Sequence, residues 1–250
     1  MLTSADVIFL IDVDNTLLDN DRFGADLSAR LDQDFGEVER RRYWSIYDTR
    51  RKQLGYADYL GALQEFRLGS DNVPAMLRMS DFLLDYPFRE RLYPRATAAI
   101  EHLRTLGSTV ILSDGDIVFQ PRKIKRACLW DAVAGRVLVY VHKDKMLDDV
   151  QRRFHARHYV MIDDKPQLLA AMKRALAERL TTVFVRQGHY AAESVRVATL
   201  PAPDLTVERI GDLCEFSLAD FHAVETPCGT NATDTSLPTS NDLEVPCARN

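Results

Sequence analysis

The chain has 250 residues, of which 46% are hydrophobic and 28% are charged, proportions that favour neither a disordered nor a membrane protein. Its formal net charge of -5 offers no basic face for a nucleic acid polymer, so such a partner is not expected. The apolar run at residues 7–11 is too short and too acidic at its borders for a secretory signal or a membrane span, and no membrane partner is expected. The four cysteines form no CxxC pair, which predicts reduced thiols in a cytoplasmic protein.

The first predicted element is a buried strand, and a long helical segment follows it. Residues 7–11 read VIFLI, a continuously apolar run of the kind found in parallel strands that are covered on both faces. From about residue 20 to residue 90, apolar and aromatic positions recur at helical spacing, with few strand signals. We therefore predict that residues 20–90 form an all-helical cap, inserted between residues 1–19 and 91–222 of one core domain.

Helices and strands alternate after the predicted cap. The expected helices span residues 96–107, 121–133, 145–154 and 168–180, and the expected strands span residues 109–112, 136–141, 158–162 and 181–185, with a last edge strand within 203–210. This alternation predicts an α/β fold with a Rossmann-like parallel sheet and helices on both faces. Cys128 is expected to be a small core residue of the second of these helices. Residues 223–250 are poor in large apolar types and are predicted to be a disordered tail.

Polar side chains follow three of the predicted strands, and a lysine follows a fourth. Because the carboxyl ends of parallel strands meet at one edge of a sheet, we expect these groups to share one crevice. Clustered carboxylates repel one another unless a cation offsets them, and an all-oxygen set suits Mg²⁺. The residues are Asp12 and Asp14, Ser113, Asp163 and Asp164, and Lys143.

Four motifs in this order resemble those of the haloacid dehalogenase superfamily, in its phosphatase branch. They read IDVDNTL, VILSDG, YVHKDKML and YVMIDDK, and the resemblance covers most of residues 5–215. The helical segment between the first two motifs resembles the superfamily's C1 cap. The dehalogenating branch lacks an acid two residues after its nucleophile, since a halide leaves without a proton. Asp14 stands at that position and favours phosphate esters.

The resemblance implies a role for each candidate residue. Asp12 would attack phosphorus to form an aspartyl-phosphate, and Asp14 would serve as the general acid and base. Ser113 would hydrogen-bond a phosphoryl oxygen, and Lys143 would stabilise the phosphoryl group and Asp12. Mg²⁺ would be held by Asp12, Asp163 and the backbone carbonyl of Asp14. Asp164 would orient a metal-bound water or Lys143 without binding the metal itself.

The resemblance thus predicts a Mg²⁺-dependent phosphatase that hydrolyses a small phosphorylated metabolite, and it leaves several points open. A phosphotransferase or mutase uses the same four motifs, and a catalytically silent binding protein would have lost an essential group, although none of the motifs is obviously broken. Lys145 could replace Lys143, which is preferred because it follows the strand sooner. Asp114 stands where the family often has Asn, and Lys165 is interpreted as a solvated charge or a partner of the acids.

Overall fold

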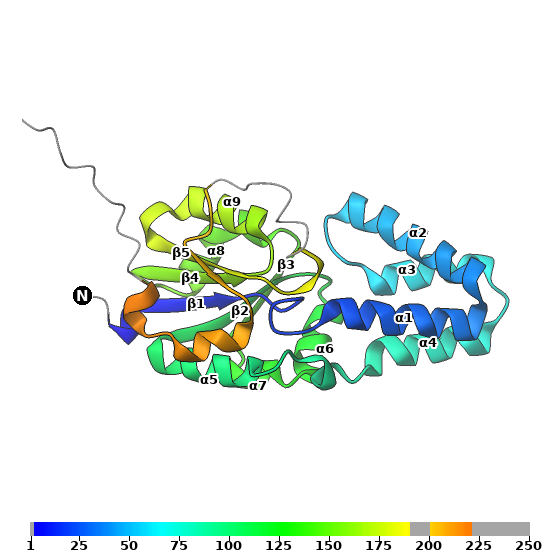
Figure 1. The fold of residues 1–250 in the computed structure, drawn as a ribbon. Coiled ribbons are helices and arrows are strands. Elements are labelled where there is room, and N and C mark those ends of the chain that lie inside the picture. The colour runs from blue at the N-terminus through cyan, green and yellow to red at the C-terminus, as the bar shows by residue number, and fades with distance from the viewer. Residues whose placement is uncertain (1–2, 191–200, 222–250) are drawn as a thin grey trace, which may run out of the picture.

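A computed structural model describes residues 3–190 and 201–221, so the predicted tail lies outside the described residues (Figure 1). The described residues form one sheet of six strands, all paired in parallel in the order β3-β2-β1-β4-β5-β6. The parallel α/β fold predicted from the sequence is confirmed, including the edge strand β6. The strands are β1 (Val7–Ile11), β2 (Ser108–Asp114), β3 (Val137–Tyr140), β4 (His158–Asp163), β5 (Leu180–Val185) and β6 (Leu205–Val207).

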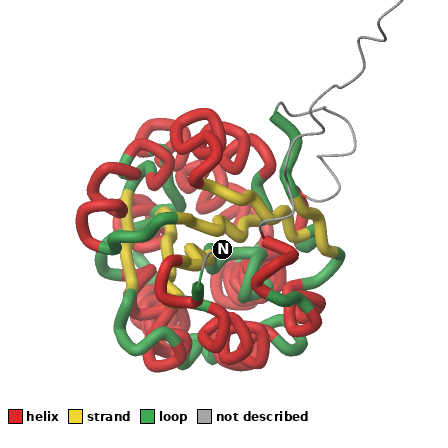
Figure 2. Tube along the Cα trace, turned by 90° about the vertical axis from the view of Figure 1, so that its left-hand side faces the viewer, coloured by secondary structure: helices red, strands yellow, loops and turns green. Residues whose placement is uncertain are grey.

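The central strand β1 has a continuously apolar sequence because both of its faces are covered. Successive side chains of a strand point to opposite faces of the sheet. Phe9 and Ile11 pack into the hydrophobic cluster on one face, and Ile8 and Leu10 pack into the cluster on the other. Because helices cover both faces, every residue of β1 is buried, and Figure 2 shows the strands enclosed between helices.

Two layers of helices enclose the sheet. One layer contains α5 (Ala96–Leu106), α6 (Phe119–Arg126) and α7 (Leu129–Ala132), which contribute to the hydrophobic cluster that includes Phe9 and Ile11. The opposite layer contains α8 (Leu147–Arg153) and α9 (Pro166–Leu176). None of the helices in the described part of the chain is long and apolar enough to cross a membrane.

The single helix predicted over residues 121–133 is wrong, because the structure divides it into α6 and α7. The break is at Cys128, whose φ of 59° is in the left-handed region, where a helix cannot continue. Ala127 and Leu129 are buried on either side, whereas Cys128 is exposed and is not a core residue. No Gly or Pro marks the break, so the local sequence gave no signal of it.

The segment predicted to be the cap contains four α-helices: α1 (Asn20–Phe35), α2 (Glu37–Leu54), α3 (Tyr59–Phe66) and α4 (Val73–Asp85). They lie beyond the carboxyl edge of the sheet (Figure 1). Side chains at their N-terminal boundaries accept hydrogen bonds from backbone N–H groups that lack a helical partner, as Asp19 does for α1, Asp58 for α3 and Asn72 for α4. Gly36, with a φ of 85°, turns the chain between α1 and α2.

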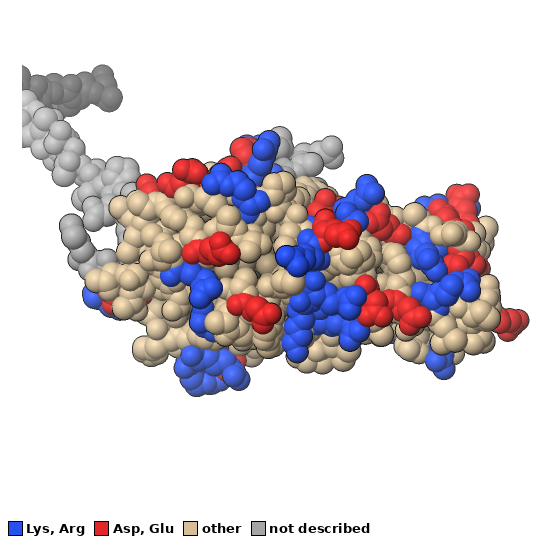
Figure 3. All heavy atoms as spheres, turned by 90° about the horizontal axis from the view of Figure 1, so that it is seen from below, with Lys and Arg blue, Asp and Glu red and all other residues tan. Residues whose placement is uncertain are grey.

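Basic residues of α6 bind the last turn of the cap helix α4. Arg122 and Arg126 each form an ion pair with Asp85, at 3.0 and 3.1 Å, and each also donates to a backbone carbonyl near the end of α4. Figure 3, which views the molecule from the side of α5 to α7, shows Lys and Arg side chains gathered where core and cap meet. These contacts join the cap to the core close to the sheet edge.

Two glycines provide a test of how tightly the core layer is packed. A Cβ at Gly107, between α5 and β2, would lie 2.6 Å from the backbone oxygen of Val7, whereas a Cβ at Gly24 in α1 would meet nothing within 4 Å. We expect Gly107→Ala to lower the free energy of unfolding by about 1–3 kcal/mol through overpacking. Gly24→Ala should raise it by about 0.5–1 kcal/mol through helix propensity. Urea unfolding of both variants measures the difference, and equal effects would contradict the described packing.

Candidate active site

Asp12 lies directly after β1 and is buried at the carboxyl edge of the sheet. Its backbone N–H donates to the carbonyl of Ile162 on β4 at 3.0 Å, which brings Asp12 level with the end of that strand. The side-chain ammonium of Lys143 contacts Asp12 Oδ1 and lies 2.6 Å from Asp163 Oδ2. One fully buried lysine therefore bridges the carboxylates that end two neighbouring strands.

Lys143 is held in this position by groups at the end of β2. Its backbone N–H donates to Asp114 Oδ1 at 2.7 Å, and Nζ donates to the carbonyl of Leu112 at 3.2 Å. Burial alone would lower the pKa of Lys143, but Asp12 and Asp163 outweigh burial and raise its pKa above the usual range. The lysine is thus a fixed positive charge, and Asp114 is the acceptor that fixes its loop. Lys145 is exposed.

Three buried carboxylates form a group suited to a cation. Asp12, Asp163 and Asp164 each offer one oxygen, and these oxygens lie within 4.8 Å of one another. Burial, together with Asp163 and Asp12, raises the pKa of Asp164 to about 9, and burial also raises the pKa of Asp163 in spite of Lys143. Within the described residues, Asp12 Oδ2 and both oxygens of Asp164 are buried without a hydrogen-bond partner. An all-oxygen donor set with unsatisfied buried oxygens fits Mg²⁺.

Lys165 lies beside the same carboxylates. Its backbone N–H donates to Asp163 Oδ1 at 2.8 Å. Burial would lower the pKa of its side chain, but Asp12 and Asp163 raise it further, so the pKa is above the usual range. Of the two interpretations drawn from the sequence, the structure favours a partner of the acids. Asp164 belongs to the carboxylate group itself, beyond the orienting role that the motif resemblance implies for it.

Asp14 points its side chain to a different set of partners. Lys123 Nζ lies 2.8 Å from Asp14 Oδ1 and 3.0 Å from Oδ2, and Gln120 Nε2 donates to Oδ2 at 3.2 Å. Gln120 also donates to Ser113 Oγ at 3.0 Å, which links the end of β2 to Asp14. The carboxylate of Asp14 is therefore separate from the group formed by Asp12 and its neighbours.

Sequence reasoning missed Lys123 and Gln120. Both lie on the buried face of α6, where Phe119 and Ile124 are the apolar members. Helical spacing assigns this Gln and this Lys to the buried face. Polar groups are rarely buried without a partner, so their position was the available signal of a partner elsewhere in the chain.

Two contacts join the cap to the loop that follows β5. Arg51, near the end of α2, donates to the hydroxyl of Tyr190 at 2.8 Å. Asp21, in the first turn of α1, accepts from the backbone N–H of His189 at 2.8 Å and lies 2.7 Å from its ring Nδ1. The cap is thus in contact with the carboxyl edge of the core on the side of β5.

A haloacid dehalogenase-like hydrolase from Burkholderia xenovorans is 58% identical to this chain, with a TM-score of 0.80, and the match covers 85% of this chain and 99% of that one. The chain belongs to the haloacid dehalogenase-like hydrolases. The HAD-hydrolase YfnB of Bacillus subtilis, solved with bound magnesium, has a TM-score of 0.54 at 18% identity, with 84% and 97% covered. An L-2-haloacid dehalogenase has the same TM-score, identity and coverage. No protein-family model and no curated protein matches the chain.

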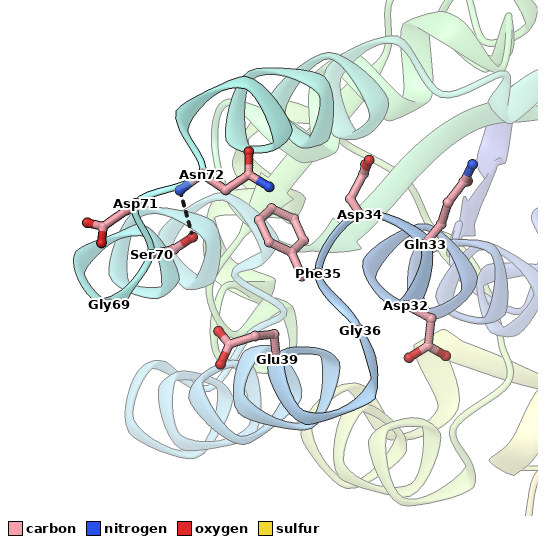
Figure 4. Close-up of a pocket in the computed structure, with 10 residues that line it drawn as sticks. All are labelled: Asp32, Gln33, Asp34, Phe35, Gly36, Glu39, Gly69, Ser70, Asp71 and Asn72. Atoms are coloured by element: carbon pink, nitrogen blue, oxygen red, sulfur yellow. Dashed lines mark hydrogen bonds between the residues drawn. The ribbon is translucent and has the colours of Figure 1, made fainter.

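A hollow in this hydrolase lies at the end of the cap that faces away from the sheet (Figures 1 and 4). It has a volume of about 600 Å³. Asp34, one of its acids, is paired with Arg30 at 2.6 Å and with Arg78 at 2.8 Å, so its charge is offset. None of the predicted site residues lines it. The lining residues are Asp32, Gln33, Asp34, Phe35, Gly36, Glu39, Gly69, Ser70, Asp71 and Asn72.

The raised pKa of Asp164 predicts a pH-dependent stability of the hydrolase in EDTA. The folded protein keeps this proton up to about pH 9, whereas an unfolded chain loses it near pH 4. Between these values the folded state binds more protons, so this residue lowers stability as pH rises. Asp164→Asn lacks the titration and should gain stability relative to the wild type between about pH 5 and pH 8, as measured by urea unfolding. The exposed control Asp148→Asn should show no such gain, and parallel curves for Asp164→Asn and the wild type would refute the assignment.

Proposed function

We propose that the protein is a Mg²⁺-dependent phosphatase that hydrolyses a small phosphomonoester through an aspartyl-phosphate on Asp12. The observation that carries the proposal is the separation of Asp12 from Asp14. Asp12 is buried against Lys143 and the other carboxylates, and Asp14 is partly exposed among different donors. One environment suits a nucleophile, and the other suits a group that exchanges protons with substrate and water.

The acid at position 14 favours a phosphatase over a dehalogenase. Solved structures of similar fold include an L-2-haloacid dehalogenase, so the fold alone does not separate the two activities. A halide departs as a stable anion, whereas an alkoxide needs a proton as its bond to phosphorus breaks. Asp14, with 22% of its side chain exposed, supplies a carboxyl group at the edge of the site for that transfer.

Two displacements at phosphorus make up the reaction. A carboxylate oxygen of Asp12 bonds to phosphorus while the ester bond breaks, and protonated Asp14 gives its proton to the departing alkoxide. Asp14, now a carboxylate, removes a proton from a water molecule that attacks the aspartyl-phosphate. The bond between Asp12 and phosphorus breaks, and inorganic phosphate leaves with Asp12 regenerated.

Fixed positive charge and hydrogen-bond donors around Asp12 would stabilise the transferring group. Lys143 lies against Asp12, where an ammonium offsets the charge of both the nucleophile and the phosphoryl oxygens. Ser113 Oγ accepts from Gln120 and donates to the backbone carbonyl of Asp114 over a long 3.4 Å contact, so its proton would turn to a phosphoryl oxygen when a substrate binds. Asp12, Asp163 and Asp164 would hold Mg²⁺, with the backbone carbonyl of Asp14 that the resemblance implies. The bound cation would neutralise charge on the phosphoryl oxygens.

The position of the cap favours a small substrate. Its contacts with the core through Asp21 and Arg51 leave the helices of the cap above the sheet edge, where a closed cap would exclude bulk water from the reacting groups. A phosphate ester of small size fits under such a cap more readily than a folded protein does.

The first test is phosphate release from a panel of small phosphomonoesters, with Mg²⁺ or with EDTA. We expect turnover only with Mg²⁺, and Asp12→Asn should reduce it to background because the nucleophile is lost. Release of halide from 2-haloacids, without any phosphate release, would favour a dehalogenase instead. Turnover that appears only when a phosphoryl acceptor is added would favour a phosphotransferase.

A matched pair of lysine variants tests the role of the buried ammonium. Lys143→Met should lower kcat by about 10²–10³-fold, since the charge that stabilises the transferring group is lost. Lys145→Met, two residues away and exposed, should leave kcat within about twofold of the wild type. Equal losses in the two variants would contradict the assignment of Lys143.

A further inference from the structure

We propose that Lys123 is a positioning residue that fixes the carboxylate of Asp14 and leaves one defined oxygen, Oδ1, to exchange the proton. The inference rests on the proposed phosphatase function, because it deepens the role that function gives to Asp14.

The ammonium of Lys123 uses all its hydrogens on three acceptors. Its Nζ lies 2.8 Å from Asp14 Oδ1, 3.0 Å from Asp14 Oδ2 and 3.0 Å from Asn20 Oδ1. An ammonium has three donor hydrogens, so the number of donors equals the number of acceptors. A lysine held on three sides by fixed acceptors is itself fixed, and it fixes the carboxylate that it grips.

Lys123 is a charged side chain in an aromatic environment. Its side chain is fully buried, and four aromatic rings surround Nζ with centroids 5.4–5.8 Å away: Phe23, Tyr59, Phe88 and Phe119. Removing an ammonium from water is costly, and the aromatic rings offset part of that cost through cation–π contacts. Asp14 is the anion that this buried ammonium contacts.

Counting acceptor positions identifies the free oxygen of Asp14. A carboxylate has about two lone pairs on each oxygen. Oδ2 accepts from both Lys123 and Gln120, whereas Oδ1 accepts from Lys123 alone. The open position is on Oδ1, and 22% of the Asp14 side chain is exposed to receive a substrate.

Lys123 also connects Asp14 to the cap. Asn20 is the first residue of α1, and its Nδ2 donates to the hydroxyl of Tyr59 on α3 at 3.3 Å. Tyr59 stacks on Tyr47 of α2, with ring centroids 4.8 Å apart. The position of Asp14 is thus set jointly by α6 of the core and by three cap helices.

The test compares an alkyl phosphate with an aryl phosphate whose phenolate leaves without a proton. If Lys123 acts through Asp14, then Lys123→Met should lower the single-turnover rate of ester cleavage by about 10–100-fold for the alkyl ester and by less than about threefold for the aryl ester. Single-turnover release of the alcohol or phenol is measured because the later hydrolysis of the aspartyl-phosphate is the same for both esters. Asp14→Asn should show the same preference more strongly. The double variant should be no slower than Asp14→Asn alone, because the lysine has no other catalytic route.

Lys125→Met is the matched control, a Lys→Met change on the exposed face of the same helix. It should leave the single-turnover rate for both esters within about twofold of the wild type. Equal losses of Lys123→Met on the two esters, or losses that multiply with those of Asp14→Asn, would mean a merely structural role and would overturn the inference.

Asn20→Leu provides a second variant if Lys123→Met fails to fold, as judged by the absence of a cooperative unfolding transition. It removes one acceptor of the ammonium and should give a smaller loss with the same preference for the alkyl ester; no such preference would overturn the inference. If the wild type hydrolyses neither ester with Mg²⁺, the proposed function itself fails. Turnover by the wild type with alkyl-selective loss in Asp14→Asn but not in Lys123→Met would reject only the role of Lys123.

Discussion

Negative charge concentrated at the carboxyl edge of the sheet is the constraint on which the rest of the structure depends. The parallel pairing of β1 with β4 sets Ile11 beside Ile162, so the aspartates that follow these residues arrive side by side. Buried carboxylates at this spacing repel one another, and leaving them ionised without a partner would be costly. Lys143 offsets part of this charge by reaching Asp12 and Asp163 together, and the oxygens that stay unsatisfied are those a hard cation would use.

Two lysines divide the acids of the site into two groups with different chemistry. Lys143 holds Asp12 buried at the sheet edge, whereas Lys123 holds the partly exposed Asp14 at the boundary between core and cap. Val13, fully buried between the two aspartates, anchors the loop so that their side chains take separate directions. Acids placed in different environments can take different roles, and the proposed mechanism needs one acid that bonds to phosphorus and one that carries protons.

Much of the fold could be predicted because its signals are local. Continuous apolar runs marked β1 and β4, and the acids and the lysine after the strands could be assigned to one edge because parallel strands end together. The break at Cys128 could not be predicted, since a left-handed residue other than Gly leaves no mark in the pattern. Lys123 was missed for another reason. Periodicity identifies a buried face but not the partner of a polar residue on it, and Asp14 is 109 positions away in the sequence.

The most direct test of the central claim is to look for the covalent intermediate. The enzyme would be mixed with Mg²⁺ and its best phosphomonoester, quenched in acid during turnover, digested and examined by mass spectrometry. The account predicts a phosphoryl group on Asp12, in the peptide that follows β1, and none when Asp12→Asn is treated in the same way. A phosphoryl group on another residue, or rapid turnover with no modified peptide at any quench time, would contradict it.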